Sequence, residues 1–339
     1  MQKGQKAVLL INVGTPDKAE VKAVRRFLSQ FLNDRRVMEM PWLLRKILVN
    51  IIIVPFRAPK STKLYEKLWT ADGSPLLLNT EKFADRLRPA LGENYQVFTA
   101  MRYGNPSLKK TLQHIRDQGF GEMVVFPLFP QYASSTTGTI LEFVRKEVHG
   151  WKVSPKLYFV NQFYDHPGFL EAFTKNISDC HPEEFDHIIF SYHGLPLRQV
   201  DKVHPGISSA RCQCEKQMPA YGSNCYKATC YKTTRLLAEK LGLDKQQYSV
   251  GFQSRFSKNW LNPFTDQLIK RLAAGGAKTI LVTVPSFVAD CLETLVEVEV
   301  GYDKLFRELG GEKLVLVKSL NDSELWVKTA ADIIREQSS

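Results

Sequence analysis

The chain has 339 residues, of which 44% are hydrophobic and 24% are charged, and its formal net charge is +11. This composition is that of an ordinary folded protein and excludes disordered and collagen-like chains. The length is about twice that of a typical domain, so we expect two domains. The positive charge favours anionic partners, but it does not choose among nucleic acid, acidic lipid headgroups and carboxylate-bearing small molecules.

Short apolar runs, each followed by turn residues and a longer helical pattern, recur along the chain. This alternation is typical of parallel strands joined by crossover helices. Eight strands are predicted, at residues 7–13, 95–100, 123–128, 156–160, 187–192, 248–253, 279–284 and 314–317. The first run resembles a signal peptide but ends at Gly14 and Pro16 without a small-residue cleavage site. We therefore interpret it as a strand and expect a cytoplasmic protein.

An apolar stretch near the N-terminus is surrounded by cations. Between Lys22 and Lys67 there are eleven lysines and arginines against three acids, and residues 41–54 within this stretch are mostly apolar. The segment is too short to span a bilayer, and Arg45 and Lys46 interrupt it. It could rest on a membrane surface, or it could be an amphipathic core helix with a solvated basic edge.

The two halves of the chain resemble each other at three places. Residues 10–16 match 190–196, residues 95–102 match 248–255, and residues 123–127 match 281–285. Three matches in the same order predict two related α/β domains divided between residues 150 and 165, with a ligand in the cleft between them. No G-x-G-x-x-G or Walker A pattern follows a strand, so no nucleotide cofactor is expected.

Four of the six cysteines lie within nineteen residues, at Cys212, Cys214, Cys225 and Cys230. Their spacing suits four thiolates at one centre, either a tetrahedral zinc or an iron–sulfur cluster. Disulfides and free thiols are the alternatives. Nothing else in the chain indicates secretion, and clustered cysteines in a long intracellular enzyme more often bind metal or act in catalysis.

His193 follows a predicted strand and precedes Gly194, a position from which a side chain can project into a cleft. A structural histidine is the alternative. Further along, Asp290 and Glu293 could form a capping box without any function. Glu293 and Glu297, one helical turn apart, would repel each other unless they face a cation or share a proton. A neutral histidine opposite them would complete a site that binds a divalent metal or accepts protons.

Several motifs together resemble the ferrochelatase family. They are residues 10–16, 73–76, 101–104, 130–132 with 135–138, 191–194, 252–255, Trp260 and 290–295, in the family's order over residues 5–335. The resemblance implies two similar Rossmann-like domains, each a parallel sheet flanked by helices, with the active-site cleft between them. The first domain would be residues 5–158, with a porphyrin-binding lip at about 41–76, and the second residues 159–335, with a cysteine loop at about 204–232.

The resemblance also implies an activity, the insertion of ferrous iron into protoporphyrin IX to form protohaem in the last step of haem biosynthesis, with release of two protons. His193 and Glu293 match the family's catalytic pair, in which the histidine accepts pyrrole protons or ligates the metal. Glu297 and Glu299 match acids that guide metal or protons. The implied porphyrin contacts are Arg57, Lys60, Tyr65, Ser74, Arg102, Tyr132 and Trp260. Residues 41–56 resemble an apolar lip that rests on a membrane.

The four clustered cysteines resemble those of a bacterial subgroup that carries a [2Fe–2S] cluster on an internal loop of the second domain. Zinc is the alternative on ligand chemistry. Cys180 and Cys291 are left over, and Cys291 is expected to pack or to serve as an accessory metal ligand.

Other functions remain open from the sequence. One is a related chelatase that uses coproporphyrin or another tetrapyrrole, or that inserts cobalt or nickel. Another is a non-catalytic porphyrin-binding or iron–sulfur sensor. No nucleic-acid partner is expected.

Overall fold

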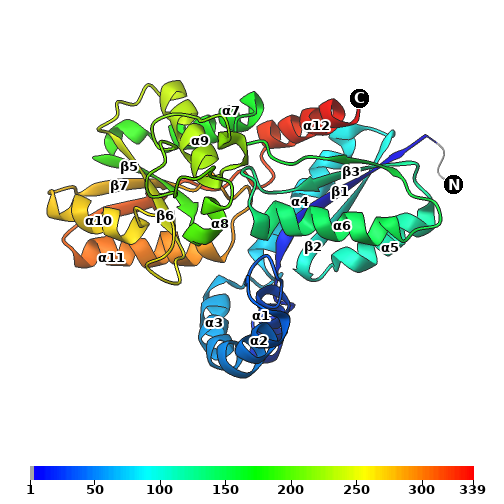
Figure 1. Ribbon diagram of the computed structural model, residues 1–339. Helices are drawn as coiled ribbons and strands as arrows, with labels where there is room; N and C mark the ends of the chain where they lie inside the picture. The colour runs from blue at the N-terminus through cyan, green and yellow to red at the C-terminus, as the bar shows by residue number, and fades with distance from the viewer. Residues whose placement is uncertain (1–3) are drawn as a thin grey trace. The chain divides into compact units, whose positions relative to one another are not determined.

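The computed structural model describes residues 4–339 and contains all eight predicted strands (Figure 1). They are β1 (Lys6–Thr15), β2 (Tyr95–Gly104), β3 (Glu122–Pro127), β4 (Lys156–Phe159), β5 (His187–His193), β6 (Tyr248–Gln253), β7 (Thr279–Thr283) and β8 (Lys313–Leu316). The largest difference from the predicted bounds is at the end of β2. This strand continues to Gly104 because its last residues still pair with Asn12, Gly14 and Thr15 of β1.

The strands form two four-stranded parallel sheets with the same order. One sheet runs β2-β1-β3-β4 and the other β6-β5-β7-β8, so the repeat in the sequence is a repeat in topology. The turns after β2 and β6 also match: Met101 N donates to Pro106 O at 2.7 Å, and Phe252 N donates to Pro263 O at 2.9 Å. The predicted α/β class with two similar parallel sheets is confirmed.

Helices follow most of the strands. The α-helices are α1 (Val21–Leu32), α2 (Trp42–Ile47), α3 (Val54–Leu68), α4 (Pro75–Leu91), α5 (Leu108–Gln118), α6 (Thr139–His149), α7 (Pro167–Ser178), α8 (Leu197–Asp201), α9 (Tyr226–Lys240), α10 (Thr265–Ala274), α11 (Asp303–Glu308) and α12 (Glu324–Ser338). Three segments are π-helical, namely η1 (Leu48–Ile53), η2 (Ser134–Gly138) and η5 (Glu293–Tyr302). Two short 3₁₀ turns are η3 (Pro182–Glu184) and η4 (Gly222–Asn224).

The chain divides into two compact units. The first contains the residues up to 129, residues 133–162 and residues 322–339, and the second contains residues 130–132 and 163–321. The predicted domains are residues 5–158 and 159–335, so α12 was expected in the second domain. The packing of α12 instead groups it with the first unit, because Trp326 is fully buried and stacks on Phe83 of α4 at 5.5 Å between ring centroids.

A glycine lies close to the carboxyl end of β1 and of β5, where a neighbouring strand approaches. Gly14 has φ +112°, and a Cβ there would lie 1.8 Å from the carbonyl oxygen of Tyr103. In the second unit, a Cβ on Gly194 would lie 2.8 Å from the carbonyl oxygen of Gln253 and 3.3 Å from the ring of Trp260. These glycines therefore let the residues around them approach at the carboxyl ends of the strands, where the candidate site residues lie.

Candidate functional site

His193 is the last residue of β5, and its ring is oriented by the backbone of the residue that follows it. The side chain is half-buried, and Nδ1 lies 2.7 Å from the carbonyl oxygen of Gly194. A carbonyl can only accept, so Nδ1 carries the proton and the lone pair of the neutral ring is on Nε2. The main chain is held as well, because His193 N donates to Ser286 Oγ at 3.3 Å and the Tyr226 hydroxyl donates to His193 O at 2.9 Å.

Two aromatic side chains flank this ring. Trp260 and Phe287 lie with ring centroids 6.4 Å and 6.3 Å from that of His193. The Trp260 segment is fixed beside His193 by main-chain pairing, since Leu261 N donates to Leu195 O at 2.9 Å. Trp260, predicted as a pocket residue, thus lies beside the predicted catalytic histidine in the second unit.

The glutamates lie on a π-helix. The sequence predicted an ordinary helix opened by Asp290, but η5 begins at Glu293 and makes no side-chain cap hydrogen bond. The Asp290 carboxylate instead accepts from Thr294 Oγ1 at 3.1 Å, from Ser319 N at 3.2 Å and from Asn321 Nδ2 at 2.7 Å. Asp290 therefore ties the start of η5 to the segment after β8, which replaces the capping-box interpretation.

Glu297 is held by three donors. Ser254 N and Oγ donate to its carboxylate at 2.9 Å and 2.5 Å, and the Tyr302 hydroxyl donates at 3.1 Å. Burial raises the pKa of Glu297 and the negative charge of Glu293 adds to the rise, while the Ser254 hydrogen bonds and the charge of His193 oppose it. The net pKa lies above its usual range, so this carboxylate takes up a proton more readily than a free glutamate.

Glu293 is positioned through its main chain and its side chain. Gln253 Nε2 donates to Glu293 O at 3.3 Å, and Ser191 Oγ orients that amide by donating to its Oε1 at 2.6 Å. The thiol of Cys291 donates to Glu293 Oε2 at 3.1 Å. Burial and the nearby carboxylate raise the pKa of Cys291, which favours the thiol form that donates to Glu293.

His193 and Glu293 both act on the pKa of Glu297, so the structure brings these three predicted residues together. Glu299 is exposed, and among the described residues it makes no hydrogen bond or ion pair with these three. Sequence reasoning missed the supporting roles of Ser254 and Tyr302. Ser254 belongs to a motif that was noted, but its unusual φ of +62°, which presents both its N–H and its hydroxyl to Glu297, has no sequence signal.

The other predicted porphyrin contacts differ in exposure. In the first unit, Lys60 is exposed and Arg57 is half-buried, and both lie on α3. Tyr65 is 7% exposed and packs edge-on against Phe27, and Ser74 is 2% exposed and hydrogen bonded to Thr15. In the second unit, Tyr132 is half-buried.

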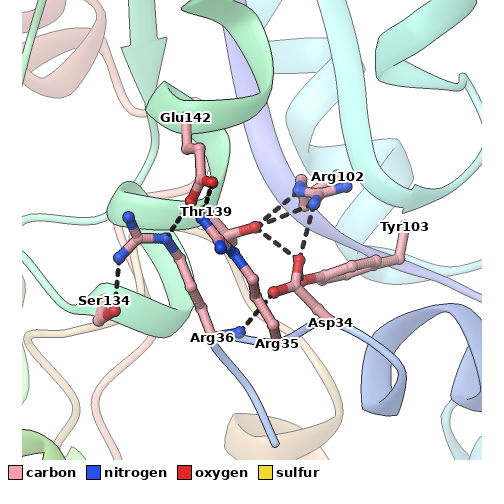
Figure 2. A network of polar contacts seen from close by, with 8 residues as sticks. All are labelled: Asp34, Arg35, Arg36, Arg102, Tyr103, Ser134, Thr139 and Glu142. Atoms are coloured by element: carbon pink, nitrogen blue, oxygen red, sulfur yellow. Dashed lines mark hydrogen bonds and ion pairs between the residues drawn. The ribbon is translucent and has the colours of Figure 1, made fainter. Parts of the chain in front are cut away.

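Arg102 lies in a polar network of the first unit (Figure 2). Its Nη2 donates to Asp34 Oδ2 at 2.7 Å and to Thr139 Oγ1 at 2.9 Å. Asp34 also accepts from Thr139 Oγ1 at 2.6 Å, from the Tyr103 hydroxyl at 2.9 Å and from Arg36 N at 2.8 Å. Burial would raise the pKa of Asp34, but the hydrogen bonds of Thr139, Arg36 and Tyr103 and the Arg102 charge hold it below its usual value.

A second carboxylate extends this network. Glu142 of α6 accepts from both Arg35 and Arg36, and Arg36 also donates to Ser134 Oγ at 2.8 Å (Figure 2). Next to the network lies a cavity of about 640 Å³ whose lining includes Asp34 and Arg102 and the further cations Arg26, Lys46, Lys109 and Lys110. Asp34 was not singled out from the sequence, because nothing in its local pattern separates it from other loop acids.

The apolar segment of the first unit is largely exposed. On α2, η1 and the start of α3, the side chains that face solvent are Trp42 (64% exposed), Leu43, Leu44, Ile47, Ile51 (66%), Ile52 and Phe56 (74%). This exposure argues against the amphipathic core helix considered above, because such a helix would bury these side chains. Within residues 4–339, no helix combines the length and the apolar character that crossing a bilayer requires.

The cysteine loop brings three possible metal ligands together. His204 Nε2 lies 3.1 Å from Cys225 Sγ and 3.7 Å from Cys214 Sγ, and the two sulfurs are 3.9 Å apart. All three residues are buried, and they could hold a metal ion. All six cysteines are free, so the disulfide interpretation is not supported.

Two of the four cysteines predicted to share a centre are outside this group. Cys212 Sγ faces the carbonyl oxygen of Ser209 at 3.2 Å, and Cys230 is fully buried on α9. A [2Fe–2S] cluster with four cysteine ligands needs all four thiolates around it. The described donors are one imidazole and two thiols, so this arrangement does not fit the four-cysteine cluster, whose ligand set stays a prediction.

The chain is similar to known proteins over nearly its whole length. The sequence profile of the family described as ferrochelatase matches residues 5–338. A ferrochelatase of Legionella pneumophila (strain Lens) is 39% identical over 337 residues, covering 98% of this chain and 99% of the relative. One from Coxiella burnetii (strain Dugway 5J108-111) is 40% identical over 337 residues, covering 97% and 93%.

A solved structure has the same fold. The sirohydrochlorin chelatase SirB from Bacillus subtilis subspecies spizizenii, in complex with cobalt, superposes with a TM-score of 0.54 at 10% identity, covering 98% of this chain and 95% of that one. At this identity the likeness concerns the fold alone. The full-length match to the family and to its curated members decides the identity: this chain belongs to the ferrochelatases, lyases that insert ferrous iron into porphyrin to form haem.

Proposed function

We propose that this protein inserts Fe²⁺ into protoporphyrin IX to form protohaem, with His193 as the base that accepts pyrrole protons and Glu293 as the acid that works with it. The observation that carries the assignment is the hydrogen bond between His193 Nδ1 and Gly194 O, which leaves the lone pair of Nε2 available for a proton or for the incoming iron.

The neighbouring carboxylates suit the same chemistry. Insertion of one Fe²⁺ displaces two pyrrole protons, so the site needs more than one proton acceptor. Glu297 has a raised pKa and lies within electrostatic reach of His193 and Glu293, which makes it a suitable second acceptor. Glu299 is exposed, so we assign it the outer role of guiding iron or protons.

The porphyrin carries two propionates and an otherwise apolar ring. We assign the propionates to Arg57 and Lys60, and Trp260 and Tyr132 to the apolar ring. Tyr65, Ser74 and Arg102 complete the predicted contact set. Tyr65 and Ser74 are almost completely buried and Arg102 is paired with Asp34, so substitution of these three is expected to affect folding as well as binding.

The activity test is an anaerobic assay with Fe²⁺ and protoporphyrin IX, followed by growth of the haem absorption bands. His193→Ala and Glu293→Gln should each lower turnover at least about 100-fold, because each removes a proton-transferring group. Porphyrin binding, measured by fluorescence quenching, should persist. The matched control is Glu308→Gln, an exposed glutamate on α11, which should leave turnover unchanged.

Near-normal turnover in His193→Ala would overturn the catalytic assignment. Faster turnover of coproporphyrin than of protoporphyrin IX would keep the enzyme class and change the substrate. Porphyrin binding without any turnover in the unmodified protein would favour a sensor.

We infer that the exposed apolar segment 42–56 rests on the cytoplasmic face of a membrane, from which a poorly soluble porphyrin can be taken up. Support comes from large apolar side chains that face solvent beside the exposed Lys46 and the half-buried Arg57. The double variant Trp42→Ser, Phe56→Ser should lose co-sedimentation with anionic vesicles. Equal binding of the variant would contradict the inference.

We also propose that the loop at residues 204–232 holds a resident metal centre. The family resemblance implies a [2Fe–2S] cluster on Cys212, Cys214, Cys225 and Cys230, and ligand chemistry also allows zinc. Iron insertion involves no net electron transfer, so the role of such a centre would be structural or sensory. No step of the reaction is assigned to it.

A further inference from the structure

We propose that the second unit holds a single zinc ion bound by His204, Cys214 and Cys225, with Cys212 as the fourth ligand, and that Cys230 is not a ligand. The proposal concerns the resident centre alone and does not depend on the chelatase activity. It rests on the spacing of the donor atoms, the burial of the histidine and the direction of Cys230 on its helix.

The donor atoms already have the spacing of a tetrahedral site. With Zn–S bonds of about 2.3 Å and Zn–N bonds of about 2.0 Å, tetrahedral geometry separates two sulfurs by about 3.8 Å and a sulfur from a nitrogen by about 3.5 Å. The sulfurs of Cys214 and Cys225 are 3.9 Å apart, and His204 Nε2 is 3.1 Å from one and 3.7 Å from the other. The three atoms therefore mark three corners around one ion.

The same spacing argues against a binuclear cluster. A [2Fe–2S] centre divides its four protein ligands into two pairs, one pair on each iron, so ligands of different pairs are farther apart than two ligands of one metal. Here His204, Cys214 and Cys225 are all mutual neighbours, with ligand atoms within 4.8 Å of one another. Three mutual neighbours fit one ion and not two pairs.

His204 packs against the Tyr221 ring at 5.1 Å between ring centroids, but this contact leaves its polar nitrogens unexplained. Its side chain is 6% exposed, its Nε2 faces the two sulfurs, and its Nδ1 has no hydrogen-bond partner among the described residues. Thiols are weak hydrogen-bonding groups, and buried polar groups normally have good partners. A metal bond to Nε2 would account for a buried imidazole that faces two cysteines.

Cys225 is well placed to act as a thiolate. It is the N-cap residue of α9, and its sulfur accepts from Ala228 N at 3.5 Å. The partial positive charge at a helix N-terminus favours the thiolate form, which is the form that binds metal.

Cys230 points elsewhere because of the helix. It lies five residues after Cys225, which corresponds to a rotation of about 140° around the axis of α9. Its fully buried side chain lies beside the hydroxyls of Tyr192 and Tyr226. Reaching the other cysteines would require unwinding the first turns of a 15-residue helix.

Cys212 is the natural fourth ligand. It is half-buried, it lies two residues before Cys214 in the chain, and its Sγ faces a carbonyl oxygen, Ser209 O, at 3.2 Å. Three thiolates and one imidazole around Zn²⁺ carry a net charge of −1. The buried ammonium of Lys227 would lie beside that charge, since it donates to the same Ser209 carbonyl at 3.0 Å; it also forms an ion pair with Glu215 Oε1 at 2.7 Å.

The test is metal analysis of the full-length protein, produced and purified anaerobically with both zinc and iron supplied. We expect one zinc per chain, no acid-labile sulfide and no visible absorption. His204→Ala, Cys214→Ser and Cys225→Ser should each lower the bound zinc at least tenfold. Cys230→Ser is the matched control and should keep full zinc content. Two irons with sulfide, retained in His204→Ala and lost in Cys230→Ser, would overturn the proposal.

A second variant separates loss of the ligand from loss of the fold. His204→Cys offers four thiolates and should still bind metal. With cobalt in place of zinc, this variant should gain sulfur-to-cobalt charge-transfer absorption over the unmodified protein while keeping tetrahedral d–d bands. An unchanged cobalt spectrum in His204→Cys would mean that residue 204 is not a ligand, whatever the behaviour of the alanine variant.

Discussion

At Asp34, four donors from different parts of the first unit meet one buried carboxylate. Arg102 Nη2, Thr139 Oγ1, the Tyr103 hydroxyl and Arg36 N all donate to it. Arg102 was predicted as a porphyrin contact, but its Nη2 is already hydrogen bonded to Asp34 and Thr139. A role in substrate binding would therefore have to use the remaining donors of this guanidinium.

Replacing Asp34 by Asn should lower the free energy of unfolding by about 3 kcal/mol at neutral pH, because it leaves the mostly buried Arg102 without its counter-ion. The pKa of Asp34 is lowered in the folded protein. Its stabilising effect is therefore complete above the unfolded-state value of about 3.9 and is lost as the pH falls through the lower folded-state value. Urea denaturation should show the difference between the two proteins shrinking below about pH 4.

Asp85→Asn is the control for this experiment. Asp85 is paired with Arg88 on the exposed face of α4, and its side chain is 67% exposed. An exposed pair of this kind contributes about 0.5 kcal/mol or less, so this variant should unfold like the unmodified protein at each pH. A pH-independent difference for Asp34→Asn would show that the carboxylate charge is not the source of its effect.

At the scale of the element, the strands could be predicted from the sequence and the π-helices could not. Each strand is a short apolar run bounded by turn residues, and the internal repeat indicated which strands of the first half match strands of the second half. The segment Glu293–Tyr302 has the same spacing of acids whether it is an α-helix or a π-helix, so its true form has no sequence signal. Asp290 shows the same limit, because its partners Ser319 and Asn321 are remote in sequence.

The cysteine loop shows a related limit of what the sequence can predict. Spacing alone groups Cys230 with the other cysteines, but α9 begins at Tyr226 and turns Cys230 away from them. The sequence alone does not group His204 with the cysteines, because His204 lies eight residues before Cys212 in a stretch without regular structure. The position of His193 could be predicted from the sequence, because this residue is the last of a strand. Its catalytic role stays a prediction.

Gly14→Ala tests the junction of β1 and β2. The new Cβ would lie 1.8 Å from Tyr103 O, and a φ of +112° disfavours alanine as well. We expect the variant to lose about 3 kcal/mol or more of unfolding free energy, or to fail to fold, because backbone on backbone contact cannot be relieved by a side-chain rotation. Chemical denaturation followed by circular dichroism measures the effect.

Two features of Gly14 would destabilise the alanine variant, namely the close approach of Tyr103 and the positive φ. The variant Gly92→Ala separates their effects on the unfolding free energy. Gly92 also has a positive φ, of +79°, but a Cβ there would meet nothing within 4 Å. This variant should lose about 1–3 kcal/mol, the cost of placing alanine in a backbone conformation that essentially only glycine adopts. Equal losses in the two variants would show that the close approach to Tyr103 does not matter.

At the scale of the whole molecule, the C-terminal helix completes the first unit. Trp326 is fully buried, stacks on Phe83 and contacts Phe126 of β3 edge-on at 6.4 Å. Trp326→Ala should therefore lower the unfolding free energy by about 3–5 kcal/mol. Trp42→Ala, at a residue that is 64% exposed, should change it by about 0.5 kcal/mol or less. A small effect of Trp326→Ala would contradict the packing of α12 as described.

Residues 322–339 belong to the first unit although they follow the second unit in the chain, and this has a consequence for synthesis on the ribosome. Residues 163–321 contain nearly all of the second unit, whereas the first unit needs residues 322–339, which are made after them. The second unit therefore has its complete sequence while the first still lacks the helix that covers Phe83 and Phe126. The second unit is thus completed before the first, and the apolar surface that the unfinished first unit exposes is the part that a chaperone would have to protect until α12 has been made.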